Sequence, residues 1–232
     1  MYPFFLFQSP ATDTTSTATD APKEISFSLW DIIISSGTIG IIITIIMVLM
    51  SIVAIYILIE RFLTIQRAGK VDKGFMDQIK IYVQKGDVES ALNLCRNTDT
   101  PVARLVEKGL QRIGKPLEDI QAAVQNVGNL EIYKMERSIS YLATISGAAP
   151  MTGFLGTVTG MILSFMTMAG GDVSTGALAG GIYQALITTA FGLVVGIIAY
   201  IGYNTLVANI DRVIFKMEAA TMEFMDMLQE PA

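Results

Sequence analysis

The sequence predicts an all-α membrane protein with three transmembrane helices and a cytoplasmic helical bundle between spans one and two. Of its 232 residues, 52% are hydrophobic and only 16% are charged, whereas soluble domains usually carry about a quarter charged residues. Residues 32–59, 138–171 and 173–210 contain no Asp, Glu, Lys or Arg. Each run exceeds the roughly 20 residues that a helix needs to cross a bilayer, so the sequence predicts three crossings.

The basic residues predict the orientation of these crossings. Thirteen of the 16 Lys and Arg residues lie between the first two charge-free runs, whereas only Lys23 precedes the first run. The short connection around Asp172 holds none, and Arg212 and Lys216 follow the third run. Because positively charged loops stay in the cytoplasm, we expect the N-terminus outside and the C-terminus in the cytoplasm.

The chain before the first span divides into two parts. Residues 1–24 are rich in Ser, Thr, Pro and Ala, which is typical of a disordered lead-in. Residues 25–37 suit a short helix at the outer interface, with Trp30 as an anchor. The first span, at 38–63, is rich in Ile, Val and Leu around its whole circumference, which is typical of a lipid-facing helix.

Two charged residues end the first span. We interpret Glu60 and Arg61 as interface anchors whose charged ends reach toward water from the end of a helix. The alternative is a contact between subunits.

The cytoplasmic region at 64–137 shows helices separated by turn signals. These signals are Lys85-Gly86-Asp87, Asn97 to Pro101, and Gly114-Lys115-Pro116. About seventy residues of this kind predict a small bundle rather than a catalytic domain. Its expected core comprises Val83, Ala91, Leu92, Leu94 and Cys95. We expect Cys95 to act there as a small buried apolar residue.

Beyond Pro116 the sequence has few helix breakers before the second span at 138–170, so we expect one long helix to enter the membrane. A periplasmic turn at 171–177 and a third span at 178–208 follow. The last part, 209–232, predicts a cytoplasmic helix or tail. Its apolar side is expected to pack between subunits and contains Met217, Met222, Met225 and Met227.

Spans two and three each place small residues on one face. The second span has such a face at spacings of three and four, made by Gly153, Thr157, Gly160, Ser164 and Thr167. The third span repeats the pattern with Gly181, Ala185, Thr189, Gly192, Gly196 and Ala199. Small residues at this period allow two membrane helices to approach closely.

Close packing accounts for the Gly and Ala residues but less well for the polar side chains at membrane depth, which are Thr157, Ser164, Gln184, Thr188 and Thr189. Such side chains usually face a bundle interior or a water-filled cavity. Three helices are too few to enclose a cavity, so we expect oligomerisation around an axis or a partner helix in the groove. Packing alone and a lined central path both stay open.

Composition excludes several other functions. The chain has no histidine and one cysteine, which removes the commonest general base and metal ligand, so we expect neither an enzyme nor a metal site nor a cofactor. The net charge of −5 argues against nucleic-acid binding. No carboxylate lies within the charge-free runs, so any proton relay needs an acid from a second polypeptide.

Two long motifs resemble the ExbB/TolQ/MotA ion-channel family. The run from Ala149 to Gly160, APMTGFLGTVTG, resembles the family's second-span signature, and Gly181 to Leu193, GIYQALITTAFGL, resembles its third. The order of elements over about residues 29–210 is also similar, and three spans resemble the ExbB/TolQ branch.

The resemblance implies a homopentamer around single-span ExbD/TolR-like partners that carry the ion-binding Asp. It also implies a place in the bacterial inner membrane, with a periplasmic N-terminus. Such a complex uses ion-motive force to energise an envelope protein of the TonB or TolA type. On these terms Thr157 and Thr189 face the ion path. Gln184 stands where the family commonly has a glutamate, which keeps polarity but removes charge. A non-conducting scaffold that only binds helices is the alternative, and proton and sodium are both open.

The charge asymmetry predicts a labelling pattern. In a Cys95→Ser background, Ser174→Cys should react with a membrane-impermeant maleimide added outside the cytoplasmic membrane, whereas Lys108→Cys should not, because basic segments stay inside. The reverse pattern would overturn the predicted orientation.

Overall fold

The computed structural model describes residues 37–70, 74–171 and 175–229, and within them it contains helices and turns but no strand. Three of its helices are long and apolar enough to cross a membrane, which confirms the predicted fold class. The lead-in at 1–24, Trp30 and nearly all of the expected interfacial helix at 25–37 lie outside the described residues. The helices are α2 (Gly37–Ala68), α3 (Phe75–Gln84), α4 (Val88–Asn97), α5 (Pro101–Leu110), α6 (Leu117–Glu136), α7 (Ile139–Ala169) and α8 (Thr175–Gln229).

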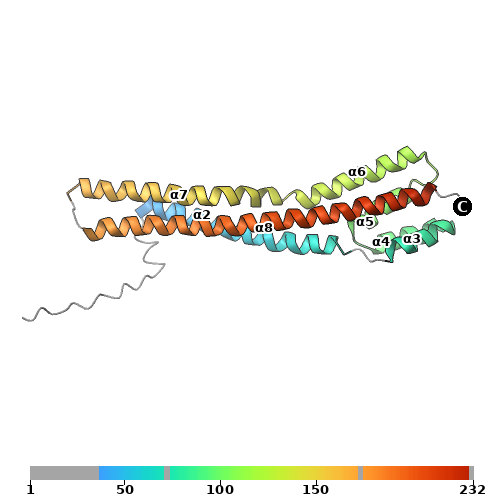
Figure 1. Ribbon diagram of the computed structural model, residues 1–232, viewed down its shortest axis with the longest axis horizontal. Helices are drawn as coiled ribbons and strands as arrows, with labels where there is room; N and C mark the ends of the chain where they lie inside the picture. The colour runs from blue at the N-terminus through green and yellow to red at the C-terminus, as the bar shows by residue number, and fades with distance from the viewer. Residues whose placement is uncertain (1–36, 71–73, 172–174, 230–232) are drawn as a thin grey trace, which may run out of the picture.

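The helices form an elongated bundle (Figure 1). Helix α8 runs along its whole length, and α7 and then α6 lie beside its two halves. Helix α2 packs against both α7 and α8, and α3, α4 and α5 gather where α8 ends. The apolar spans therefore lie at one end and the charged bundle at the other.

The short helices α3, α4 and α5 begin and end at or near the expected turn signals. Asp87 caps α4 by accepting a hydrogen bond from the backbone N–H of Ser90, and Thr100 caps α5 by accepting one from Ala103. Gly86 and Gly114 adopt positive φ angles of 73° and 90°, which residues other than glycine rarely adopt. These boundaries are local, so the sequence alone predicts them.

The expected unbroken helix from the cytoplasm into span two is interrupted, since Arg137 and Ser138 separate α6 from α7. The reason is a contact from α2. The guanidinium of Arg61 donates to the carbonyl oxygen of Lys134 at 3.1 Å and to Oγ of Ser138 at 2.6 Å. In a continuous helix that carbonyl would accept from the backbone N–H of Ser138. Helix α8, by contrast, runs unbroken from the third span to Gln229.

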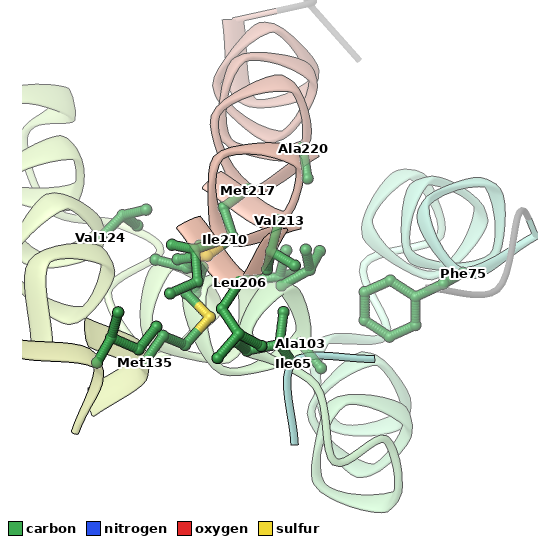
Figure 2. Packing of buried hydrophobic residues seen from close by; sticks show 14 of the residues in the cluster. Ile65, Phe75, Ala103, Val124, Met135, Leu206, Ile210, Val213, Met217 and Ala220 are labelled. Atoms are coloured by element: carbon green, nitrogen blue, oxygen red, sulfur yellow. The ribbon is translucent and has the colours of Figure 1, made fainter. Parts of the chain in front are cut away.

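The bundle core forms around α8. Leu206, Ile210, Val213 and Met217 are each at most 4% exposed, and Figure 2 shows them among residues of α2, α5 and α6. The expectation that the C-terminal methionines pack between subunits needs correction, because most of them pack inside their own chain. Met217 and Met227 are buried and Met225 lies against the core, whereas Met222 is 67% exposed.

One buried carboxylate joins α5 to α6. The side chain of Glu131 is only 5% exposed and accepts from Arg104 at 2.9 Å and from Lys134 at 2.7 Å. Burial by itself lowers the pKa of Arg104, but its hydrogen bonds and ion pairs with Glu131 and Asp99 raise it overall. A buried carboxylate costs desolvation energy unless it is paired, and both of its oxygens are paired here.

Burial of the single cysteine predicts an unreactive thiol. Burial, and then the negative charge of Glu107, raise the pKa of the Cys95 thiol to about 12, so the thiolate is nearly absent at pH 8. Alkylation by iodoacetamide at pH 8, followed by intact mass, should be slower in the folded protein than in denaturant by at least about a hundredfold. Equal rates in both states would contradict this burial.

Candidate functional site

Helices α7 and α8 share the most extensive contact in the protein, and glycines make it possible. A Cβ atom added to Gly192 would lie 2.7 Å from the carbonyl oxygen of Ala149 and 3.0 Å from Cα of Gly153. A Cβ on Gly160 would lie 2.9 Å from Cβ of Ala185. Backbone atoms cannot move aside as flexible side chains do, so these positions accept only glycine without a shift of the helices.

Two further glycines predicted on these faces lie in the same contact. A Cβ on Gly181 would collide with Oγ of Ser164, and one on Gly196 would lie 2.6 Å from Cγ of Pro150. The two faces derived from the 3–4 spacing therefore meet each other along most of the spans.

This close approach brings two predicted ion-path threonines together. Oγ1 of Thr157 and Oγ1 of Thr189 are 3.0 Å apart. Thr189 also donates to the carbonyl oxygen of Gly153 at 2.8 Å, and Thr157 donates to that of Phe154 at 2.7 Å. Thr157 is 9% exposed.

The two hydroxyls carry two protons between them, which is fewer than the three hydrogen-bond contacts that they make. Each hydroxyl carries one proton and two lone pairs, yet Thr157 and Thr189 take part in three contacts of hydrogen-bond length. When both donate to carbonyl oxygens, the two Oγ1 atoms face each other with lone pairs and no proton between them. The pair then can accept a hydrogen bond from a third group.

The other three predicted path residues lie in a separate place. A pocket of about 410 Å³ opens between α2, α7 and α8. Among its lining residues are Ser164, Gln184 and Thr188, but neither Thr157 nor Thr189. Oγ of Ser164 donates to the carbonyl oxygen of Gly160 at 2.9 Å, and Oγ1 of Thr188 donates to that of Gln184 at 3.0 Å. The five residues thus form two neighbouring polar sites.

Helix α2 closes one side of this pocket with Gly40 and Ile43. The sequence suggested that span one faces lipid around its whole circumference, but one of its faces is packed against α7 and α8. Ile43 and Met47 are 5% and 1% exposed, while Ile42 and Leu49 are 53% and 61% exposed. Both faces carry the same kinds of apolar residue, so composition could not distinguish the packed face from the exposed one.

Sequence reasoning missed two residues of the pocket, Gly156 and Thr159. Both line it, and a Cβ on Gly156 would lie 2.6 Å from Cγ2 of Thr188. Gly156 lies four residues before Gly160, and Thr159 lies three residues after Gly156, so both follow the spacing of one helix side at or beside the small-residue face. That spacing was the available signal.

The predicted interface anchors at the end of α2 have different surroundings. The side chain of Arg61 is only 14% exposed, whereas that of Glu60 is 41% exposed. Nε of Arg61 lies 3.2 Å from Oε2 of Glu60, and its other nitrogens contact the α6–α7 junction. Arg61 therefore joins two helices at this level. Residues 37–70, 74–171 and 175–229 contain no cluster of three or more His, Cys, Asp or Glu that could hold a metal ion.

Comparison with known proteins gives a family match over the same elements. A model of the MotA/TolQ/ExbB proton channel family matches residues 97–219, which is more than half of the chain. An ExbB biopolymer transport protein of Neisseria meningitidis is 30% identical over 70% of this chain and 79% of its own length. TolQ of the Tol-Pal system of Pseudomonas aeruginosa is 35% identical over 48% of this chain and 49% of its own.

A third relative matches a smaller share of this chain than the ExbB protein of Neisseria meningitidis does. An ExbB homolog of Methanothermobacter thermautotrophicus is 34% identical over 59% of this chain, and the chain spans about half of that relative's length, 48%.

The glycine contact predicts a large effect from one added methyl group. Gly192→Ala should force α7 and α8 apart and cost about 1–3 kcal/mol, which should lower the midpoint of thermal unfolding in detergent by several degrees. Gly180→Ala is the matched control on the same helix, because its added Cβ meets no atom within 4 Å apart from those of its chain neighbours and its own helix backbone. Equal midpoints for the two variants would contradict the close approach.

Proposed function

Because the chain belongs to the MotA/TolQ/ExbB proton channel family, we propose that it is the multi-pass subunit of an ion-driven machine in the inner membrane. In this proposal, copies of the chain surround a single-span partner of the ExbD/TolR type. The complex couples proton or sodium motive force to mechanical work on a TonB- or TolA-like envelope protein.

The observation that supports this most is the Thr157–Thr189 pair inside spans without any charged residue. The pair offers lone pairs in a site of low dielectric, where a hydrogen bond to an ionisable partner is strong. The spans contain no acid of their own. A carboxylic acid on a partner helix would donate its proton to these lone pairs, and after losing the proton it would accept from a hydroxyl that turns away from its backbone carbonyl.

The pocket beside α2 would play a second role in this machine. Its polar residues are neutral, and they include the amide of Gln184 and the hydroxyls of Ser164 and Thr188. Neutral dipoles can hold water in a membrane-embedded cavity without trapping an ion as a fixed charge would. We propose that this pocket holds water near the ion path and does not bind the ion itself.

A single copy leaves much of its apolar surface uncovered. Phe154, Phe165 and Leu186 are each more than half exposed, and three spans are too few to enclose a path. We therefore propose a ring in which α7 and α8 of each copy face the centre.

The ring predicts a definite stoichiometry. The protein purified alone in mild detergent should give a mass of five copies in native mass spectrometry, as the family resemblance implies. Finding only monomers or dimers would contradict the ring.

A non-conducting scaffold is the second candidate, and one observation favours it. The Thr157 and Thr189 hydroxyls already have backbone acceptors within their own chain. Threonines bonded in this way can serve helix packing alone.

Removing each hydroxyl distinguishes the two functions. Thr157→Val and Thr189→Val keep the side-chain shape, so assembly should be unchanged. A hydrogen bond to a charged group contributes about 1.5–3 kcal/mol, so its loss should shift proton loading of the partner by about tenfold or more. Each variant should abolish ion-driven work in a transport or envelope-energisation assay. Gln184→Leu should be milder and Gln184→Glu tolerated.

The control for these variants is Thr205→Val, because Thr205 is an exposed residue on the same helix whose hydroxyl bonds only the carbonyl oxygen of Ile201. It should keep full activity. If both path variants also keep full activity with normal assembly, the two hydroxyls serve helix packing alone and take no part in ion-driven work, whereas a wild type without ion-driven work would support the scaffold.

A further inference from the structure

A basic pocket lies where α2 ends beside α8. It has a volume of about 410 Å³. Its floor is apolar, with Ile65 and Val213 2% and 4% exposed. Its lining begins at Phe62 on α2 and at Asn209 on α8.

The charges of this pocket all have one sign. Lys70, Arg212 and Lys216 line it, and its lining contains no carboxylate. The neighbouring acid Asp211 lines a different pocket of α8, together with Glu136. Three cations around one cavity favour an anionic ligand, and the guanidinium and ammonium groups match a phosphate.

Two of the three cations are available for a ligand. Nζ of Lys216 donates to the carbonyl oxygen of Gly69 at 2.7 Å, and this contact fixes the end of α2 against α8. Among the residues that the structure describes, the side chains of Lys70 and Arg212 have no hydrogen bond or ion pair, and both are exposed. Their charges are therefore not neutralised within that part of the chain.

The pocket lies at the level of lipid headgroups. The charge-free runs end at Ile59 on α2 and at Ile210 on α8, and the lining begins within three residues of both ends. At about 1.5 Å per residue, Phe62 and Asn209 lie close to the hydrocarbon boundary. Headgroups occupy roughly the next 5–8 Å, a distance that Lys and Arg side chains bridge.

An apolar stripe leads from the membrane into the pocket. On α2, Ile59 and Phe62 are 53% and 38% exposed, and on α8, Ile201 is 60% exposed. Ile201 lies on the same stripe of α8 as Asn209 and Arg212, because spacings of three and four keep residues on one helix face. An acyl chain can lie along this stripe while its phosphate reaches the cations.

We propose that this pocket is a binding site for an anionic phospholipid, with the headgroup phosphate held by Lys70 and Arg212 and the acyl chains along α2 and α8. Basic pockets between membrane helices bind such headgroups. The proposal requires only that the chain spans a membrane, and it is independent of ion-driven work.

The test compares lipids that differ only in charge. Full-length protein is exchanged into mild detergent, and binding of phosphatidylglycerol and of phosphatidylcholine with identical acyl chains is titrated by native mass spectrometry. The wild type should prefer phosphatidylglycerol. Each cation near an anionic lipid contributes about fivefold in affinity, so Lys70→Gln with Arg212→Gln should lose about 25-fold for phosphatidylglycerol and little for phosphatidylcholine.

The control pair removes two cations at a similar level outside the pocket, by Arg67→Gln with Arg137→Gln. Both residues are exposed and neither lines the pocket, so the preference should persist. The charge-retaining pair Lys70→Arg with Arg212→Lys should also keep it.

Equal binding of the two lipids by the wild type, or an equal loss in the control pair, would overturn the proposal. Loss of the lipid adducts when copies assemble would also overturn it, because a neighbouring copy would then fill the pocket. Displacement of the lipid by millimolar inorganic phosphate would show a site for a soluble anion instead.

Discussion

The close approach of α7 and α8 is the constraint on which the rest of the structure depends. Gly153, Gly160 and Gly192 remove the side chains that would otherwise hold the helices apart, and without water to expel, membrane helices associate mainly through such packing. The approach sets Thr157 and Thr189 at 3.0 Å. It also creates the surface on which α2 lies, so the polar pocket between the three helices depends on the same glycines.

The membrane helices and the charged bundle are connected by more than chain continuity. Helix α8 passes from one to the other without a break, and its Phe224 is fully buried at a position where a Cβ on Gly109 of α5 would collide with the ring. Arg61 adds a second connection, because it bonds the junction of α6 and α7 from the end of α2. A displacement of the spans relative to each other would therefore also shift the helices of the bundle.

Charge divides the molecule into zones with different chemistry. The spans offer hydroxyls, the amides of Gln184 and Asn204, and backbone carbonyls but no charged group, so they can solvate a partner's ionisable group but not replace it. Cations begin where the spans end, and Lys70, Arg212 and Lys216 converge there from two helices. Farther along, charges are paired, as Glu131 is with Arg104 and Lys134. The charge of each zone therefore suits its surroundings, which are hydrocarbon around the spans, lipid headgroups at their ends and water farther along.

The sequence by itself determined the number of spans and the turns of the bundle, because charge-free length and capping residues such as Asp87 and Thr100 act locally. It also indicated the small faces of α7 and α8, since helical periodicity is local as well. Only the tertiary structure decided which face of α2 packs, where Arg61 interrupts the helix into span two, and that the polar residues form two sites. Those features depend on the register between helices distant in sequence, and uniformly apolar surfaces such as that of α2 carry no pattern that specifies it.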